Sequence, residues 1–251
     1  MYQGFYELTS GMITQQRNLN TISNNMTNVQ TAGYKSDKMT MSTFDEQMLL
    51  RTGRVAKDRY TDLGNSTPIV KADQTYTDFS QGAPKETDGK YDFCLNGDGF
   101  FSVRTANGVQ YTRNGGFSVD ANGVLMLDNI GPVLGSDGNT ITIDNENFTV
   151  SEDGRIFSST GRQLGQLQVT TFDTTTLHKE DNGMYTETTD QGTNATGQTP
   201  ILYGYLEESN TDMIDEMTDM ISSERAYQGA AQMLKMYDNL MDSAVNTVGR
   251  L

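Results

Sequence analysis

The C-terminal part of the chain restricts the fold most, because its pattern is that of one long helix. From Asp212 to Val248 there is no proline, and Gly229 is the sole glycine. Apolar residues recur in alternating steps of three and four, with polar exceptions at Glu224 and Asp238. A helix this long with so narrow an apolar face needs another helix packed against it. The stripe contains Met213, Met217, Met220, Tyr227, Ala231, Leu234, Met241, Val245 and Val248.

The start of the chain has the same period, with an interruption at Gln15. We expect a helix over residues 1–35 and expect Gly33 to lie just past its end, because glycine enters the left-handed conformation cheaply. The spacing of its apolar residues is heptad-like. They are Leu8, Met12, Leu19, Ile22, Met26 and Val29.

Asparagines are frequent near the end of this helix, and two interpretations stay open. Asn24, Asn25 and Asn28 are either polar-face residues of a solvated helix or residues that fix the register of neighbouring helices. In the second interpretation Asn20, Asn24 and Asn28, one turn apart, form a stripe of amides that both donate and accept hydrogen bonds. Asparagine is a poor helix former, which suits a helix that forms only on assembly.

The middle of the chain has a different pattern. Asn-Gly and Asp-Gly pairs such as Asn107-Gly108 separate short apolar runs, and these pairs supply the positive φ of two-residue hairpin turns. We therefore expect an antiparallel β domain over residues 75–205. Residues 36–74 have no clear period and are expected to be an extended linker with a short helix near Phe44–Leu50.

The predicted fold is a mainly β middle domain, antiparallel and hairpin-rich, flanked by long N- and C-terminal helices. The C-terminal helix is expected over residues 206–251, and the two helices are expected to pair in a coiled-coil-like way on assembly. Charge favours such a meeting: residues 1–60 hold seven Lys or Arg against five Asp or Glu, whereas residues 205–251 hold three against nine.

The overall charge of −15 argues against a nucleic-acid partner, because binding phosphates requires clustered Lys and Arg. No apolar run of about 18 residues predicts a membrane span. The N-terminus lacks the basic start and apolar stretch of a cleavable secretory signal.

No group of residues in the sequence indicates a catalytic or metal-binding site. Cys94 and His178 each lack a second residue of their kind, and Glu207-Glu208 has nothing around it that marks a catalytic dyad. "DFCLNGDGF" lacks the spacing and the closing glutamate of a calcium loop, so a tight turn is the better interpretation. We predict that the protein is not an enzyme, with no catalytic residue, no cofactor and no metal.

Several stretches together resemble one family. "LNTISNNMTNVQTAGYK" is similar to the N-terminal signature of the flagellar axial proteins, in particular the basal-body rod proteins and their hook relatives. "DFCLNGDGFFSV" and "YTRNGGFSVDANGVL" resemble their middle domain, and "LEESNTDMIDEMTDMISSERAYQGAAQML" resembles their C-terminal signature. Thr211 and Glu224 depart from the pattern, where an aliphatic residue and a glutamine are expected, so proximal and distal rod types stay open.

The resemblance implies a structural subunit of the bacterial flagellar rod. It implies export by the flagellar type III apparatus without a cleaved signal, and a location in the basal body within the cell envelope. The implied partners are further copies of the chain, other rod and hook proteins, the export apparatus and the surrounding ring proteins. The alternative from a different class is a secreted β-domain binding module or adhesin on a coiled-coil stalk.

For a rod subunit, the apolar residues of the two helices are expected to pack together in the polymer. Asn24, Asn25 and Asn28 are then expected to set the register, and Arg225 to pair across subunits.

Overall fold

A computed structural model of the chain describes residues 2–43, 47–52, 60–66, 70–143, 147–180, 182–187 and 192–248. These residues form two compact units. The helix unit contains the described residues of 1–27, 37–76 and 212–251, and the β unit contains those of 28–36 and 77–211. Neither helix of the described chain is long and apolar enough to cross a membrane.

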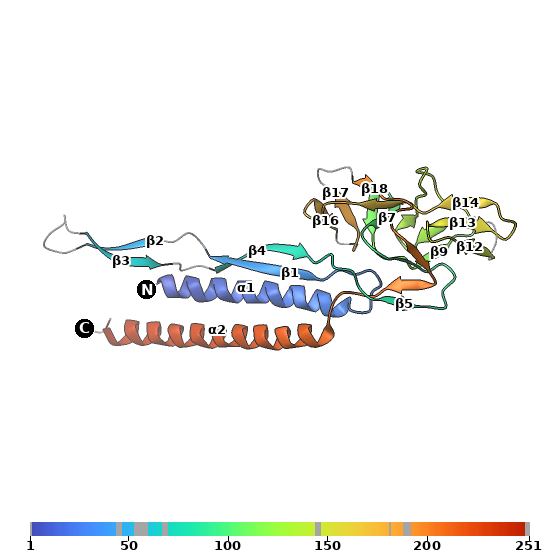
Figure 1. Cartoon of the computed structure of the whole chain (residues 1–251). Coiled ribbons are helices and arrows are strands. Elements are labelled where there is room, and N and C mark those ends of the chain that lie inside the picture. The colour runs from blue at the N-terminus through green and yellow to red at the C-terminus, as the bar shows by residue number, and fades with distance from the viewer. Residues whose placement is uncertain are drawn as a thin grey trace. The chain divides into compact units, whose positions relative to one another are not determined.

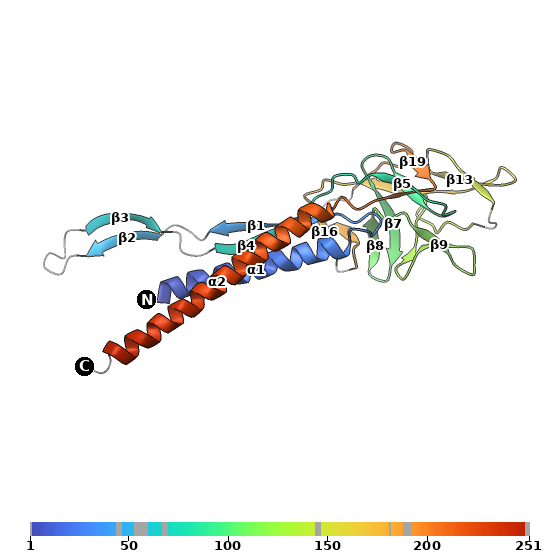
Figure 2. The same cartoon turned by 90° about the horizontal axis from the view of Figure 1, so that it is seen from below.

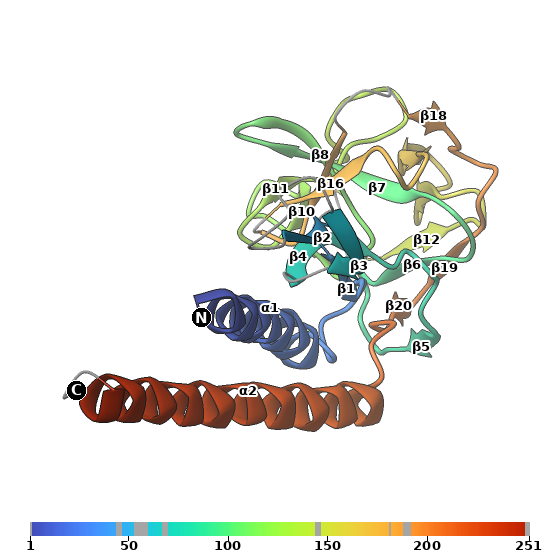
Figure 3. The same cartoon turned by 90° about the vertical axis from the view of Figure 1, so that its left-hand side faces the viewer.

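Two long helices dominate the helix unit. Helix α1 spans Tyr2–Thr27 and α2 spans Met213–Val248. They pack side by side and run in opposite directions, so the start of α1 and the end of α2 lie at the same end of the pair (Figures 1 and 2). The other side of α1 contacts strand β1, which leaves α1 between α2 and a β ribbon (Figures 1 and 3).

That ribbon is a correction to the expected linker. β1 (Asp37–Thr43) pairs with β4 (Val70–Thr77), and β2 (Gln47–Thr52) pairs antiparallel with β3 (Tyr60–Ser66). The expected short helix near residues 44–50 is wrong where the structure describes it, since residues 47–50 belong to β2; residues 44–46 lie outside the described chain. Met39 and Met41 alternate with Lys38, Thr40 and Ser42, a period of two that indicates a strand.

The end of the first helix is a second correction. α1 ends at Thr27, and residues 28–33 form turns in which the Thr31 N–H donates to the Asn28 carbonyl at 3.1 Å. Asparagine and β-branched residues lower helix propensity here. Gly33 does have a positive φ of 68°, as expected of a left-handed residue, but it lies six residues beyond the helix.

The β unit is built from short antiparallel strands, which confirms the expected class of the middle domain. A six-stranded sheet in the order β16-β17-β8-β7-β15-β18 is its largest element, and β10 is the central strand of a three-stranded sheet, as is β13 of another. The two remaining pairs are β19 with β6 and β20 with β5.

The strands are β5 (Pro84–Glu86), β6 (Phe93–Leu95), β7 (Phe100–Thr105), β8 (Gly108–Thr112), β9 (Phe117–Val119), β10 (Leu125–Leu127), β11 (Gly131–Pro132), β12 (Phe148–Val150), β13 (Arg155–Ser158), β14 (Gln163–Gln166), β15 (Val169–Thr171), β16 (Leu177–Lys179), β17 (Tyr185–Glu187), β18 (Thr193–Asn194), β19 (Ile201–Tyr203) and β20 (Tyr205–Glu207).

Strand β7 separates two hydrophobic clusters, because successive side chains of a strand point to opposite faces. Phe101 and Val103 belong to the main core of the β unit, together with Phe93, Leu125 and Ile156. Phe100, one position earlier, packs instead with Tyr111 and Tyr185. The hairpin from β7 to β8 has Ala106-Asn107 as its two-residue loop, and Gly108, the first residue of β8, has a φ of 123°. The β unit thus has its own core, independent of the helices.

Candidate functional site

Three contacts fix one register between α1 and α2. The Asn18 Nδ2 donates to Ser223 Oγ at 2.9 Å, and Asn25 Nδ2 donates to Glu216 Oε1 at 2.8 Å. A Cβ atom on Gly4 would lie 3.8 Å from the Tyr237 ring. Moving forward along α1 by seven or fourteen residues matches an equal move backward along α2. The pair is therefore aligned over most of the length of α1.

Asn25 is a buried polar group of this seam with three hydrogen bonds. Its side chain is 2% exposed, it donates to the Asp37 carbonyl at 2.9 Å, and its Oδ1 accepts from the Asp37 N–H at 3.0 Å. One amide therefore joins α1 to α2 and to the start of β1. Burial raises the pKa of its partner Glu216, and Asp219 and Asp215 nearby raise it further, while the Asn25 hydrogen bond and Lys38 act in the opposite direction.

The side of each helix that faces its partner follows a heptad spacing. All of these positions are buried or partly buried. On α1 they are Gly4, Leu8, Gly11, Gln15, Asn18, Ile22 and Asn25, and on α2 they are Glu216, Met220, Ser223, Tyr227, Ala230, Leu234, Tyr237 and Met241.

The structure divides the predicted C-terminal stripe. Met220, Tyr227, Leu234 and Met241, seven residues apart, are partly buried along the seam. Met213 and Met217 are instead 40% and 45% exposed, and the seam takes the neighbouring series that starts at Glu216. Arg225 is exposed, and the side chain of Val245 lies outside the described part. The sequence pattern missed the second series because Glu216, Ser223 and Ala230 are polar or small.

The predicted N-terminal residues also separate. Ile22 and Asn25 are buried in the helix unit, Leu8, Met12, Leu19 and Met26 are partly buried, and Asn24 is exposed. Asn28, Val29 and Gly33 belong to the β unit rather than to the helix. Within one chain, Asn18 and Asn25 each donate an amide hydrogen bond from α1 to α2.

Both helices leave large apolar side chains in solvent. Ile214, Ile221 and Leu240 on α2 are 75%, 53% and 69% exposed, and Met233 and Met236 are also exposed. On α1 the exposed apolar residues are Phe5, Tyr6 and Ile13. We call these eight, with Met213 and Met217, the outer apolar residues. Such accumulation of exposed apolar surface marks an interaction site in soluble proteins.

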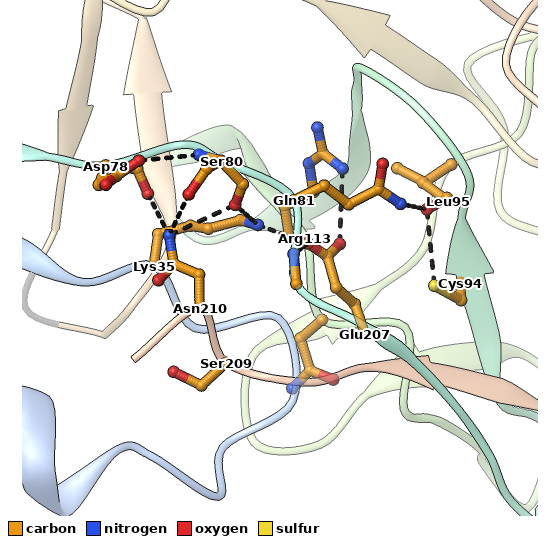
Figure 4. A network of polar contacts seen from close by, with 12 residues as sticks. Lys35, Asp78, Ser80, Gln81, Cys94, Leu95, Arg113, Glu207, Ser209 and Asn210 are labelled. Atoms are coloured by element: carbon orange, nitrogen blue, oxygen red, sulfur yellow. Dashed lines mark hydrogen bonds and ion pairs between the residues drawn. The ribbon is translucent and has the colours of Figure 1, made fainter. Parts of the chain in front are cut away.

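A buried charged cluster lies in the β unit, and sequence reasoning missed it (Figure 4). Lys35 Nζ and Glu207 Oε1 form an ion pair with both side chains fully buried. Arg113 Nη1 lies 3.4 Å from Glu207 Oε2 and donates to the Gly97 carbonyl at 2.9 Å. Glu207 also accepts from the Gly82 N–H at 3.0 Å. Lys35 closes the "TAGYK" sequence and Glu207 opens "EESN", so the cluster joins the two terminal signatures.

Two features fit Lys35 into this position. Gly33 lies so close to the backbone of Arg113 that a Cβ would be 2.4 Å from the Arg113 carbonyl carbon, and its N–H donates to the Glu207 carbonyl at 2.8 Å. Lys35 Nζ further donates to the Ser80 carbonyl at 2.7 Å. Burial lowers the pKa of Lys35, and Glu207 opposes this shift through charge and hydrogen bonding.

Two residues considered above for chemistry, Cys94 and Glu207, lie in the β unit. Cys94 is a buried free thiol whose pKa burial raises to about 11, which disfavours the nucleophilic thiolate. Glu207, considered above as part of a dyad, is paired with two cations. Within the described residues no three His, Cys, Asp or Glu side chains gather as a metal site would require.

Comparison with known proteins finds family matches at both terminal helices and in the β unit. Residues 5–35 match the family described as flagella basal body rod protein, residues 94–158 the flagellar hook protein FlgE/F/G D1 domain, and residues 203–247 the flagellar basal body rod FlgEFG protein C-terminal.

Similar proteins cover the same length. The chain is 33% identical to the flagellar hook-basal body complex protein FlhO of Bacillus subtilis and 31% identical to the flagellar basal-body rod protein FlgF of Caulobacter vibrioides, over all of both chains in each case. It is 29% identical to FlgG of Bacillus subtilis, over 98% of this chain and 99% of the relative. The chain belongs to the family of flagellar basal-body rod proteins. The adhesin alternative finds no support in this membership.

Proposed function

We propose that this protein is a structural, non-enzymatic subunit of the flagellar basal-body rod. It polymerises through its terminal helices into a hollow helical shaft that transmits torque. The relatives are named as rod proteins, and head-to-tail contacts that do not close on themselves generate helical filaments. Its place is therefore the basal body, and its partners are further copies and other rod and hook components.

The observation that carries this proposal is the set of outer apolar residues. α1 and α2 already cover each other along one seam, yet side chains such as Ile214 and Leu240 remain in solvent. Fully burying one such side chain contributes roughly 1.5–3 kcal/mol. Helices of neighbouring subunits that pack on these residues in a coiled-coil-like way would gain this stabilisation repeatedly along a filament.

The remaining parts of the proposal concern single residues and transport. Arg225 is exposed on α2 and is available for an ion pair with another subunit. Asn24 lies on the exposed side of α1, where an amide can bond to a neighbouring helix and set its register. Asn28 acts from the turn after α1, beside its bond with Thr31. The export apparatus delivers the chain, and the β unit faces the surrounding rings.

A pair of substitutions on α2 tests the helix surface. Met217→Asp places a charge among the outer apolar residues, whereas Ser222→Asp places the same charge at an exposed polar position of the same helix. Neither position lies in the seam with α1, so both chains should fold. We expect Met217→Asp to lose rod assembly and motility in cells while Ser222→Asp retains both. Normal rods with Met217→Asp would refute the proposed surface.

A further inference from the structure

The Asn-Gly pairs of the β unit serve as turns, but each is also a reactive unit. The backbone nitrogen of the glycine can attack the side-chain amide carbon of the asparagine, which forms a cyclic succinimide and releases ammonia. Water then opens the ring and leaves aspartate or isoaspartate. Glycine favours ring closure because no side chain shields its nitrogen and its backbone rotates freely. The pairs are Asn96-Gly97, Asn107-Gly108, Asn114-Gly115, Asn122-Gly123 and Asn182-Gly183.

Asn114 and its glycine are held in the interior of the β unit. Asn114 Oδ1 accepts from the Gly116 N–H at 2.9 Å, and the Asn114 N–H donates to Thr112 Oγ1 at 3.0 Å. Gly115 is buried, and a Cβ on it would lie 1.7 Å from the Phe93 carbonyl oxygen. This pair cannot close the ring without opening the surrounding structure.

Asn122 is exposed, but both reacting groups of its pair are occupied. Its Nδ2 donates to Asp120 Oδ2 at 3.1 Å, and the Gly123 N–H donates to the Asp120 carbonyl at 2.8 Å. The amide carbon and the attacking nitrogen are therefore held by two different atoms of one residue, and both bonds must break before they can meet.

Asn182 is protected in the same way. Its Nδ2 donates to Gln110 Oε1 at 3.1 Å, and its Oδ1 accepts from the Met184 N–H at 3.0 Å. The Gly183 N–H donates to the Glu180 carbonyl at 3.0 Å. Gln110 is 5% exposed, so rotation of the Asn182 amide would leave a buried polar group without this partner, which is unfavourable.

Asn96 has an exposed side chain but a backbone that is held on both sides. The Asn96 N–H donates to the Pro200 carbonyl at 2.9 Å, and the Gly97 carbonyl accepts from Arg113 Nη1 at 2.9 Å. Arg113 is 3% exposed and also contacts Glu207. Rotation of this pair would therefore disturb the buried charged cluster.

Asn107 differs from the other four. It is exposed, as is Gly108, and among the residues that the structure describes none forms a hydrogen bond with its side chain. A Cβ on Gly108 would meet nothing within 4 Å, so the space for a ring is open. The turn is held by the Thr105 hydroxyl, which donates to the Gly108 carbonyl at 2.9 Å and accepts from the Asn107 N–H at 3.3 Å.

Freeing the Gly108 nitrogen requires only a local opening. Thr105 and Gly108 are the last pair of the β7–β8 hairpin, and both flank the exposed loop. Ends of hairpins open at a much lower free energy than core strands do. The reaction at Asn107 therefore needs no change in the core of the β unit.

We propose that Asn107 is a site of spontaneous deamidation, with water as the other reactant, and that the fold protects the other four pairs. The Gly108 nitrogen bonds to Asn107 Cγ as the bond from Cγ to Nδ2 breaks, and its proton leaves with the ammonia. Hydrolysis returns a proton to that nitrogen and places hydroxide on the carbonyl carbon. The product has one more negative charge, and isoaspartate also lengthens the backbone by one carbon. This inference holds whether or not the chain forms a rod.

Peptide mapping by mass spectrometry tests the proposal on the full-length chain, incubated in mildly alkaline water enriched in heavy oxygen. Trypsin cleaves after Arg104 and Arg113, so Asn107 is the sole asparagine of peptide 105–113. We expect Asn107 to take up heavy oxygen at least about tenfold faster than each of the other four. In urea, where the fold no longer protects them, the five rates should converge.

Two variants sharpen the test. Asn107→Gln should abolish rapid uptake in peptide 105–113, since glutamine forms the corresponding larger ring far more slowly. Thr105→Val removes the hydroxyl that holds the turn, and it should speed conversion of Asn107 and leave the other four unchanged.

Equal rates at all five pairs in the folded chain would overturn the proposal, because the fold would then give no selection. Faster conversion at Asn96 than at Asn107 would also overturn it, as would slower conversion of Asn107 in Thr105→Val.

Discussion

Lys35 and Glu207 form an ion pair in which both side chains are completely buried, although 172 positions separate them in the sequence. Glu207 also contacts Arg113, so one carboxylate faces two cations. Removing one partner of a buried pair leaves the other charge poorly compensated, and this costs about 3–5 kcal/mol. The pair thus holds the segment after α1 to the segment before α2.

Lys35→Met should therefore destabilise the β unit by about 3–5 kcal/mol. The matched control is Lys85→Met, which removes the exposed pair between Lys85 Nζ and Glu208 Oε1 at 3.1 Å. An exposed pair contributes about 0–1 kcal/mol. Urea unfolding followed by tyrosine fluorescence measures both. Equal losses of stability in the two variants would contradict the assigned importance of the buried pair.

Gly33→Ala should be strongly unfavourable for two reasons. The residue has a φ of 68°, which costs an alanine about 1–2 kcal/mol, and its Cβ would overlap the Arg113 backbone. Gly11→Ala, inside α1, meets nothing within 4 Å and should raise stability by roughly 0.5–1 kcal/mol. Thermal unfolding of both variants checks the opposite signs. An unchanged unfolding temperature for Gly33→Ala would contradict the positive φ and the close approach to Arg113 assigned to Gly33.

The seam between α1 and α2 should weaken as the pH rises through the pKa of Glu216. Burial raises that pKa in the folded chain above the ordinary value of 4.5. The folded state therefore binds the proton of Glu216 more tightly than the unfolded state does. This tighter binding contributes fully to folding stability at a pH below the ordinary pKa, and the contribution is lost as the pH rises above the raised pKa. Helix content against denaturant at a series of pH values measures this.

Glu216→Gln should remove this part of the pH dependence, because a neutral amide oxygen can still accept from Asn25. Glu224→Gln is the matched control on the same helix, at an exposed position. It should leave the pH profile of the parent chain unchanged. Identical profiles for the parent and Glu216→Gln would show that Glu216 does not titrate in the seam.

Ile22→Asp should destabilise the helix unit while the β unit stays folded. Ile22 is 5% exposed within the helix unit, so a carboxylate there must be buried or must open the seam, at a cost of about 3 kcal/mol or more. The β unit has its own core and should stay folded. Ser23→Asp, one residue on and exposed, should be tolerated. Hydrogen exchange resolves the units, and rods that form normally with Ile22→Asp would contradict the predicted packing.

Periodicity and turn chemistry carried much of the fold prediction. The period of α2 and the Asn-Gly and Asp-Gly turns are local signals, and both the long C-terminal helix and the antiparallel β unit follow them. The strands β1 and β4 depend on pairing between distant segments, and their polar composition hides that pairing. α1 stops at Thr27 because residues 28–36 gain more from contacts in the β unit, such as those of Gly33, than from continuing the helix.

The residues of the candidate site were harder to predict from the sequence than the fold, because several of them depend on partners that are distant along the chain. Met220, Tyr227 and Leu234 were found because they are apolar, whereas Ser223 and Glu216 entered the seam through polar partners on α1. The Lys35–Glu207 pair gave no local signal, since each residue alone reads as an ordinary surface charge. Non-local pairing of polar side chains is what a single sequence conceals.

Hydrogen exchange by mass spectrometry, compared between dilute chain and assembled polymer, tests the central claim most directly. We predict that peptides of α1 and α2 gain protection on assembly, above all those that carry Ile214, Met217 and Leu240, while the core strands of the β unit keep the protection they already have. Helices with unchanged exchange, or a closed oligomer of fixed size in place of a growing polymer, would contradict assembly through the terminal helices.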